Sequence, residues 1–164
     1  MLDPLAIIAS LTRHDVHFVV IGGIAAALHG STTLTADLDV LYEREQANVS
    51  RLSSALAELG AQRRDLPDGV TVAVDERSLW NGTNFLFTTR HGDLECIGET
   101  PSGRFTYAQI AAGAERFDLG DGLVVRAASL DELIRMKRAA SRAKDNAEVE
   151  NLVALREVRD AKRR

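Results

Sequence analysis

Two carboxylates one residue apart, Asp37 and Asp39, are the side chains best placed for chemistry in this sequence. Side chains of a strand alternate between its two faces, so a strand here would point both carboxylates the same way. Parallel carboxylates repel each other unless a cation lies between them. Mg²⁺ prefers hard oxygen ligands and pairs readily with phosphates. The spacing therefore predicts a site for a divalent metal ion and a phosphate group.

The residues before this pair are suited to holding phosphates. Gly22 and Gly23 follow a short apolar run, and glycines let a backbone approach a ligand closely. A helix that begins after them would offer free N–H groups to an anion. Hydroxyl donors follow in a loop, at Ser31, Thr32, Thr33 and Thr35. Of these we expect Thr33 and Thr35 to bind phosphate. For the two glycines the alternative is a tight strand-to-helix turn without a ligand.

A third carboxylate is expected from another strand, and Asp93 and Glu95 are the candidates. They would share a face of that strand, so periodicity does not choose between them. Glu95 lies between Leu94 and Cys96, where a carboxylate is costly to bury without a cation, and we prefer it for that reason. Such an acid acts as a general base toward an attacking hydroxyl or completes a metal site. The alternative is a solvent-facing edge strand.

Lys137 and the pair Lys144-Asp145 form the last group. Lys137 follows apolar positions near the end of an expected helix and could reach phosphates as a point charge. Asp145 would lie in the first turn of the last helix, where a negative charge also suits the helix dipole. That second explanation is purely structural, and both remain open for Asp145.

These residues depend on alternating helices and strands. Apolar periodicity and capping residues predict helices over 4–14, 24–29, 45–59, 105–112, 129–140 and 144–162. Short apolar runs between turn signals predict strands over 18–21, 38–42, 61–64, 70–74, 84–89, 94–97, 117–119 and 123–125. We expect an α/β (α+β) fold in which helices flank a mixed sheet. A core over 1–126 would carry C-terminal helices over 127–164 in one domain.

Composition narrows the class of protein. The 164 residues are 45% apolar, which is enough for one core, and the single cysteine, Cys96, excludes an internal disulfide and fits the cytoplasm. We expect no signal peptide and no membrane span. From Arg126 onward the chain has 11 Lys and Arg against 7 Asp and Glu, although the whole chain carries a net charge of −4. This basic segment could attract a polyanion or be an ordinary solvated helix.

Three segments of the chain resemble a known group. Gly22-Gly23, His29-Gly30 and Thr35-Ala-Asp37-Leu-Asp39 are similar to the opening of the nucleotidyltransferase superfamily. Residues 92–99 resemble the strand that carries its third carboxylate. Residues 129–137, with Lys144-Asp145 and the apolar helix after them, resemble the C-terminal part of the AbiEii/MenT-like subgroup, which includes toxins of bacterial toxin–antitoxin systems. The resemblance runs from about residue 18 to residue 155.

The resemblance implies a transferase dependent on Mg²⁺ or Mn²⁺ that moves a nucleoside monophosphate from an NTP to an acceptor. Asp37, Asp39 and Glu95 would hold the metal, and Lys137 would meet phosphates. Asp145 would orient Lys137 or the nucleotide. Gly22, Gly23 and the nearby hydroxyls would hold the triphosphate. In relatives of the MenT type the acceptor is a tRNA end, in others it is a protein or is unknown, and a cognate antitoxin is the further partner implied.

The sequence departs from the family pattern in two places. Family members often have an arginine in the loop before the paired aspartates, where this chain has Ser31-Thr-Thr-Leu34, and the third carboxylate is Glu instead of the commoner Asp. These departures motivate one alternative, a catalytically silent binding module with the same fold. A small-molecule nucleotidyltransferase is the other alternative, ranked lower because a chain this short shows no separate acceptor domain.

Overall fold

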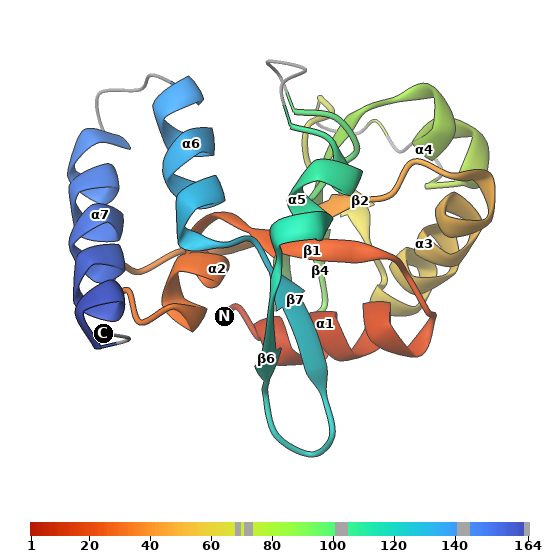
Figure 1. Ribbon diagram of the computed structural model, residues 1–164. Helices are drawn as coiled ribbons and strands as arrows, with labels where there is room; N and C mark the ends of the chain where they lie inside the picture. The colour runs from red at the N-terminus through yellow and green to blue at the C-terminus, as the bar shows by residue number, and fades with distance from the viewer. Residues whose placement is uncertain (68–69, 71–73, 101–104, 141–144, 163–164) are drawn as a thin grey trace.

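The computed structural model describes residues 1–67, 70, 74–100, 105–140 and 145–162, without the side chains of Asp145 and Asn146 (Figure 1). Its helices are α1 (Pro4–Arg13), α2 (Gly22–Leu28), α3 (Gln46–Leu59), α4 (Glu76–Asn81), α5 (Tyr107–Gly113), α6 (Leu130–Ala140) and α7 (Asp145–Lys162). Its strands are β1 (Phe18–Ile21), β2 (Asp37–Tyr42), β3 (Gln62–Arg63), β4 (Asn84–Thr89), β5 (Gly92–Ile97), β6 (Glu115–Asp118) and β7 (Val124–Ala127). The expected α/β class with helices around a mixed sheet is confirmed.

All seven of these strands form one sheet in the order β3-β4-β5-β2-β1-β7-β6. Strands β1 and β2 pair antiparallel, whereas β2 pairs parallel with β5 and β1 parallel with β7. Strands β4 and β5 form one antiparallel hairpin and strands β6 and β7 form another. The parallel β2–β5 contact joins segments more than fifty residues apart, and it is the contact that brings the acidic residues together.

Apolar residues of the strands and helices form one core. Every residue of β1 is buried, which explains why this strand reads as a continuous apolar run. Helix α3 buries Val49, Leu52, Leu56 and Leu59 along one face, as its periodicity predicts. Gly60 ends that helix with a φ of 64°, a left-handed conformation that glycine adopts without a Cβ penalty. This core fixes β1 and β2 as a rigid base beneath the acidic residues.

Two elements differ clearly from the sequence-based expectation. Helix α2 begins at Gly22 instead of residue 24, because the chain turns directly from β1 into the helix with Gly22 at a φ of 64°. Helix α4 was not expected, because its segment is short and has few apolar residues. Asp75 and Ser78 cap the helix reciprocally, and this pair is a signal in the sequence for its start. Most of the expected strand over 70–74 lies outside the described residues.

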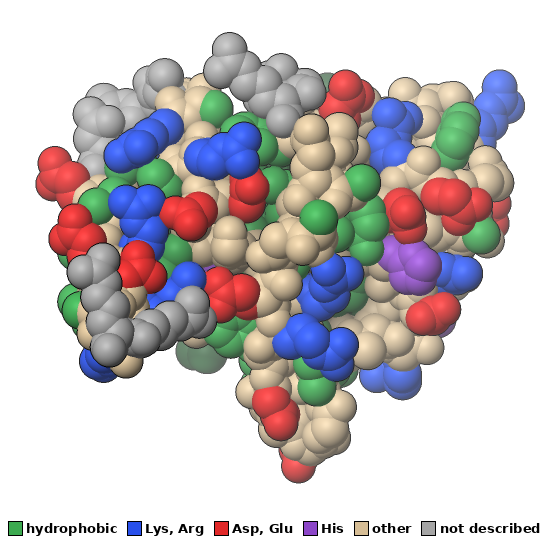
Figure 2. Space-filling model, in the orientation of Figure 1, with side chains coloured by type: hydrophobic (Ala, Val, Ile, Leu, Met, Phe, Trp, Pro, Cys, Tyr) green, Lys and Arg blue, Asp and Glu red, His purple; other side chains and the backbone are tan. Residues whose placement is uncertain are grey.

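The C-terminal helices α6 and α7 lie side by side next to α2 (Figure 1). The Ser129 hydroxyl caps α6 by accepting the Glu132 backbone N–H at 3.3 Å, as the Ser-x-x-Glu pattern predicts. On the face shown in Figure 2, Lys and Arg side chains over these helices are interspersed with Asp and Glu. None of the described helices is long and apolar enough to cross a lipid bilayer.

Candidate active site

Strands β2 and β5 carry the acidic residues that the sequence singles out. Their parallel register places Asp37 beside Asp93 and Asp39 beside Glu95. Since side chains alternate along a strand, all four carboxylates lie on one face of the sheet. The leucines between them, Leu38 and Leu94, are fully buried on the other face. The prediction that the two aspartates of β2 share a face is confirmed, and the sheet adds two further acids beside them.

Asp39 is the electrostatic centre of this group. Its pKa is raised from 3.8 to about 7, first by burial and then by the negative charges of Asp37 and Glu95. A hydrogen bond with the Glu95 side chain acts in the same direction, whereas the charge of Lys137 acts in the opposite one. Carboxylates held this close disfavour full ionisation unless a cation joins them.

The donor set fits a hard divalent cation. Carboxylate oxygens from Asp37, Asp39 and Glu95 are the ligands that Mg²⁺ and Mn²⁺ take, and an ion among them would relieve the repulsion that raises the pKa of Asp39. No three His, Cys, Asp or Glu side chains in the described ranges already surround a single metal position. The case for a divalent metal ion therefore rests on the chemical identity of the three carboxylates and on how closely they are crowded.

Gly22 is required by the position of Asp39. A Cβ at residue 22 would lie 1.9 Å from Asp39 Oδ2, and the backbone φ of 64° is one that L side chains rarely adopt. A Cβ at Gly23 would lie 2.5 Å from the Cβ of Thr35. The two glycines thus let the partly buried Asp39 carboxylate and the hydroxyl loop pack directly against the start of α2.

The hydroxyl loop after α2 borders the same space. The Thr35 hydroxyl donates to Asp37 Oδ1 at 3.1 Å, so this side chain orients a carboxylate in the structure. The Ser31 hydroxyl accepts the backbone N–H of Thr33 at 3.2 Å and shapes the turn. Thr33 is exposed at the edge of the cleft. Phosphate binding by Thr33 and Thr35 stays a prediction.

Lys137 enters the site from α6 and forms an ion pair with Glu148 of α7. Glu148 was missed by sequence reasoning, which offered Asp145 as the acidic partner. The Asp145 side chain lies outside the described residues. Glu148 follows Asp145 by three positions and so projects from a neighbouring part of the helix surface one turn later. Helical spacing could have offered both acids, but the helix packing that brings Glu148 to Lys137 is not visible in the sequence.

Arg64 is a second residue that sequence reasoning missed. Its Nη1 lies 2.5 Å from Asp93 Oδ2, and its Nη2 lies 3.8 Å from Asp37 Oδ2. The Thr88 hydroxyl also donates to Asp93, at 3.0 Å. Asp93 is therefore engaged by a cation and a hydroxyl, whereas Glu95 faces Asp39. The sheet therefore places Glu95, the candidate preferred from the sequence, beside Asp39 and places Asp93 beside Asp37.

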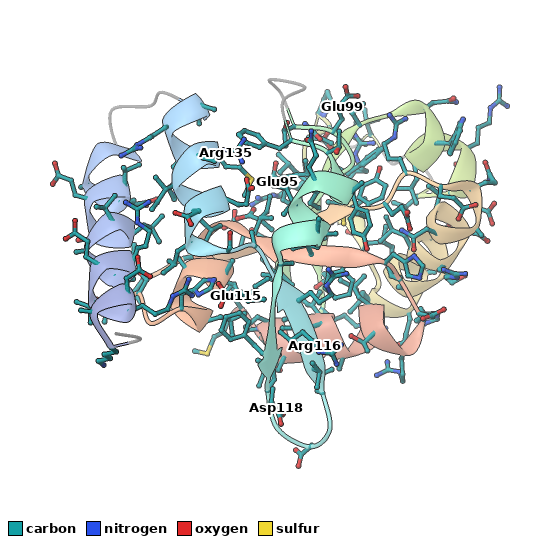
Figure 3. The ribbon with its side chains drawn as sticks, viewed as in Figure 1. Glu95, Glu99, Glu115, Arg116, Asp118 and Arg135 are labelled. Atoms are coloured by element: carbon teal, nitrogen blue, oxygen red, sulfur yellow. The ribbon has the colours of Figure 1, made fainter. Side chains whose placement is uncertain are left out.

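One cleft brings most of these residues together, and Figure 3 shows Glu95 between α6 and α5 in that view. It is lined by Gly22, Gly23, Ala26, Ser31, Thr33, Leu34, Thr35, Asp37, Asp39, Glu95, Lys137, Glu148 and Leu152. Every residue that the sequence predicts for the site and whose side chain the structure describes lines this cleft. The cleft contains a carboxylate cluster, a glycine turn and a lysine. Together these groups could bind a phosphate group that carries a metal ion.

Comparison with known proteins identifies the fold. No protein-family model and no curated protein matches the sequence. Among solved structures, TM1012 of Thermotoga maritima, a candidate nucleotidyltransferase, is 16% identical with a TM-score of 0.55, and the match covers 98% of this chain and 96% of that one.

The antibiotic-resistance factor ANT(2'')-Ia is similar in two solved structures. Its solution structure is 16% identical with a TM-score of 0.55, over 95% of this chain and 88% of that one. Its crystal structure with adenylyl-2''-tobramycin is 16% identical with a TM-score of 0.54, over 96% of this chain and 95% of that one. At this identity the likeness establishes the fold, and this chain has the nucleotidyltransferase fold.

Proposed function

We propose that this protein is a metal-dependent nucleotidyltransferase, which moves a nucleoside monophosphate from an NTP to an acceptor hydroxyl and releases pyrophosphate. The observation that carries the proposal is the partly buried Asp39, crowded by Asp37 and Glu95 in a cleft that is also lined by glycines, hydroxyls and Lys137. A carboxylate cluster of this kind is unfavourable without a cation, and retaining it is more consistent with an enzyme than with a silent module.

Asp37, Asp39 and Glu95 would hold Mg²⁺ or Mn²⁺, and the bound ions would neutralise charge on the triphosphate and polarise the acceptor hydroxyl. Thr35 fixes the orientation of Asp37 through its hydroxyl. Arg64 stands on the outer side of Asp37, where it limits the freedom of that carboxylate. The chain therefore positions its ligands by a hydroxyl on one side and a guanidinium on the other.

The glycine turn and Lys137 would bind the phosphates. Ile21, the residue before α2, makes no side-chain cap, so the first N–H groups of that turn have no such partner. Lys137 would contact a phosphate as a point charge after it exchanges Glu148 for the ligand. Charge-assisted bonds of this kind are stronger than neutral ones. Lys137 of α6 would thus supply the positive charge that an arginine of the loop often supplies in family members.

In the transfer step the acceptor oxygen would form a bond to the α-phosphorus of the NTP. The bond from that phosphorus to the bridging oxygen would break, and pyrophosphate would leave with the electron pair. Glu95 would take the proton of the acceptor hydroxyl on a carboxylate oxygen, since it lies beside Asp39 on the open face of the sheet.

For the acceptor we propose an RNA, with a tRNA end as the leading case, or a protein hydroxyl, in a toxin-type enzyme of the AbiEii/MenT kind with a cognate antitoxin. The sequence resemblance supports this choice. A second candidate is a small hydroxylated molecule. The structure of ANT(2'')-Ia with adenylyl-2''-tobramycin favours it, because a chain matched over 95% of its length accommodates that product. A separate acceptor domain is therefore not a requirement.

The test is a screen with each of the four NTPs labelled at the α-phosphate, in Mg²⁺, against total bacterial RNA, total protein and a set of aminoglycosides. We expect label in one of these fractions and its loss in Glu95→Gln. Asp93→Asn is the matched control, because Asp93 shares the face of β5 but is engaged by Arg64. Equal transfer by Glu95→Gln and wild type would contradict the assigned role of Glu95. Labelling of aminoglycosides alone would replace the macromolecular acceptor by a small one.

A further inference from the structure

The C-terminal half of α7 is fastened to the rest of the protein by Arg159. Its Nη1 lies 2.9 Å from Glu115 Oε1 and 3.0 Å from Glu115 Oε2. The same nitrogen lies 3.4 Å from His29 Nδ1. Figure 3 shows Glu115 pointing from β6 toward α2 and α7. One guanidinium therefore contacts two elements that are far from α7 in the sequence.

His29 is held in one orientation for this contact. Its Nε2 lies 2.9 Å from the Ala128 carbonyl oxygen and must carry a proton to donate there, which leaves Nδ1 as an acceptor for Arg159. The ring also packs edge-on against Phe117, with 5.0 Å between ring centroids. Because carbonyl, aromatic ring and guanidinium fix the imidazole from three sides, the group of His29, Glu115 and Arg159 is a defined tie between α2, β6 and α7.

This tie connects the two walls of the cleft. His29 and Gly30 lead directly into the hydroxyl loop, in which Ser31, Thr33 and Thr35 line the cleft. On the opposite wall, Glu148 and Leu152 come from the first half of α7. At a rise of about 1.5 Å per residue, Glu148 lies about 16 Å along the helix from Arg159. The tie therefore acts on the cleft without any contact with it.

We propose that Arg159, through His29 and Glu115, is a positioning residue that sets the spacing between the hydroxyl loop and α7, and thereby the fit of the nucleotide. This inference rests on the proposed function for the identity of the ligand. The side chains of Arg159 and Glu115 are 28% and 32% exposed, so water partly screens the pair. The Nε of Arg159 is itself buried and has no hydrogen-bond partner within the described residues, so the ion pair is made by the more exposed end of the guanidinium.

The chain supplies a matched control on the same helix. Arg156 lies one turn before Arg159 and forms an ion pair with Asp131 of α6, at 2.8 Å. Its loss removes one ion pair of α7 but leaves the connection to His29 and the hydroxyl loop intact. Arg159→Gln and Arg156→Gln therefore differ in whether α7 stays joined to that loop, while both remove a guanidinium from the helix.

The experiment measures the affinity for ATP, GTP, CTP and UTP in turn, with Mg²⁺, for wild type and both variants. It also measures hydrogen–deuterium exchange over residues 29–37 and 148–156. Outer contacts that orient ligand-binding groups typically change affinity by about 10- to 100-fold. We expect Arg159→Gln to bind about 10-fold more weakly and to exchange faster in both segments. Arg156→Gln should bind within about twofold of wild type.

Unchanged affinity and unchanged exchange in Arg159→Gln would overturn the positioning role. If wild type binds no nucleotide, the proposed function fails, and faster exchange of residues 29–37 in Arg159→Gln but not in Arg156→Gln still supports the tie. If Arg159→Gln does not fold, Arg159→Lys takes its place, because lysine keeps a charge near Glu115 but lacks the rigid planar guanidinium whose Nη1 meets both Glu115 and His29. Wild-type affinity and exchange in that variant would overturn the part assigned to His29.

Discussion

Replacing Asp39 by asparagine should stabilise the metal-free protein while abolishing transfer. Asp39 has a folded-state pKa of about 7 against an ordinary 3.8. A group whose pKa is raised on folding lowers the free energy of unfolding as the pH rises from its unfolded to its folded pKa. At about 1.4 kcal/mol per pKa unit, the cost of ionised Asp39 at pH 8 is about 4 kcal/mol as an upper value. Asparagine keeps the shape, removes this cost and can donate to Glu95.

The assay is thermal unfolding in a chelator at pH 8 and at pH 5. If half of the cost is recovered, a gain of about 2 kcal/mol corresponds to a rise in Tm of about 4–8 °C for a chain of this size. The gain should shrink at pH 5, where wild-type Asp39 is protonated, and also at pH 8 in Mg²⁺, which binds only wild type tightly. Asp93→Asn is the control and should lose stability, because it breaks the ion pair with Arg64. A Tm of Asp39→Asn at or below wild type at pH 8 would refute the reasoning.

Three further predictions concern the same cleft. Gly22→Ala should lower the free energy of unfolding by at least about 1–2 kcal/mol, because a residue with a Cβ is penalised in the left-handed conformation. It should also abolish transfer, because that Cβ would collide with Asp39. A denaturation midpoint equal to that of wild type would contradict this prediction. Glu148→Gln should lower the KM for NTP several-fold at unchanged kcat, since it removes a carboxylate that competes with phosphate for Lys137; a higher KM would instead make Glu148 a nucleotide ligand. Calorimetry should show Mg²⁺ binding about 10-fold weaker at pH 6 than at pH 8, because protons compete for Asp39 at a pKa of about 7; equal affinities would exclude Asp39 as a ligand.

The sequence predicts the elements of the site better than their mutual contacts. Alternation along β2 is a local property, so the shared face of Asp37 and Asp39 follows from the sequence alone. Periodicity does not separate Asp93 from Glu95, and their different surroundings depend on the register between β2 and β5 and on Arg64, which contacts Asp93 from the end of β3. Such pairing is set by the folded sheet as a whole.

The contacts between helices are likewise set by the folded structure and not by local sequence. The apolar stripe and cap of α6 place Lys137 near the end of that helix, but its partner depends on how α7 packs against α6. Likewise, nothing local in the sequence joins His29 to Arg159, which are 130 positions apart. Helix α4 is the opposite case, since the capping pair Asp75 and Ser78 was a local signal that could have found it.

The most direct test of nucleotidyl transfer compares NTP labelled at the α-phosphate with NTP labelled at the γ-phosphate, in Mg²⁺ and in the presence of the acceptor fractions. We predict that the α-label moves to an acceptor while the γ-label leaves as pyrophosphate, and that Asp39→Asn does neither. Transfer of the γ-label, or release of free phosphate without pyrophosphate, would contradict a nucleotidyltransferase. Failure of wild type to bind any NTP at millimolar concentration would show that the fold serves here as a binding module.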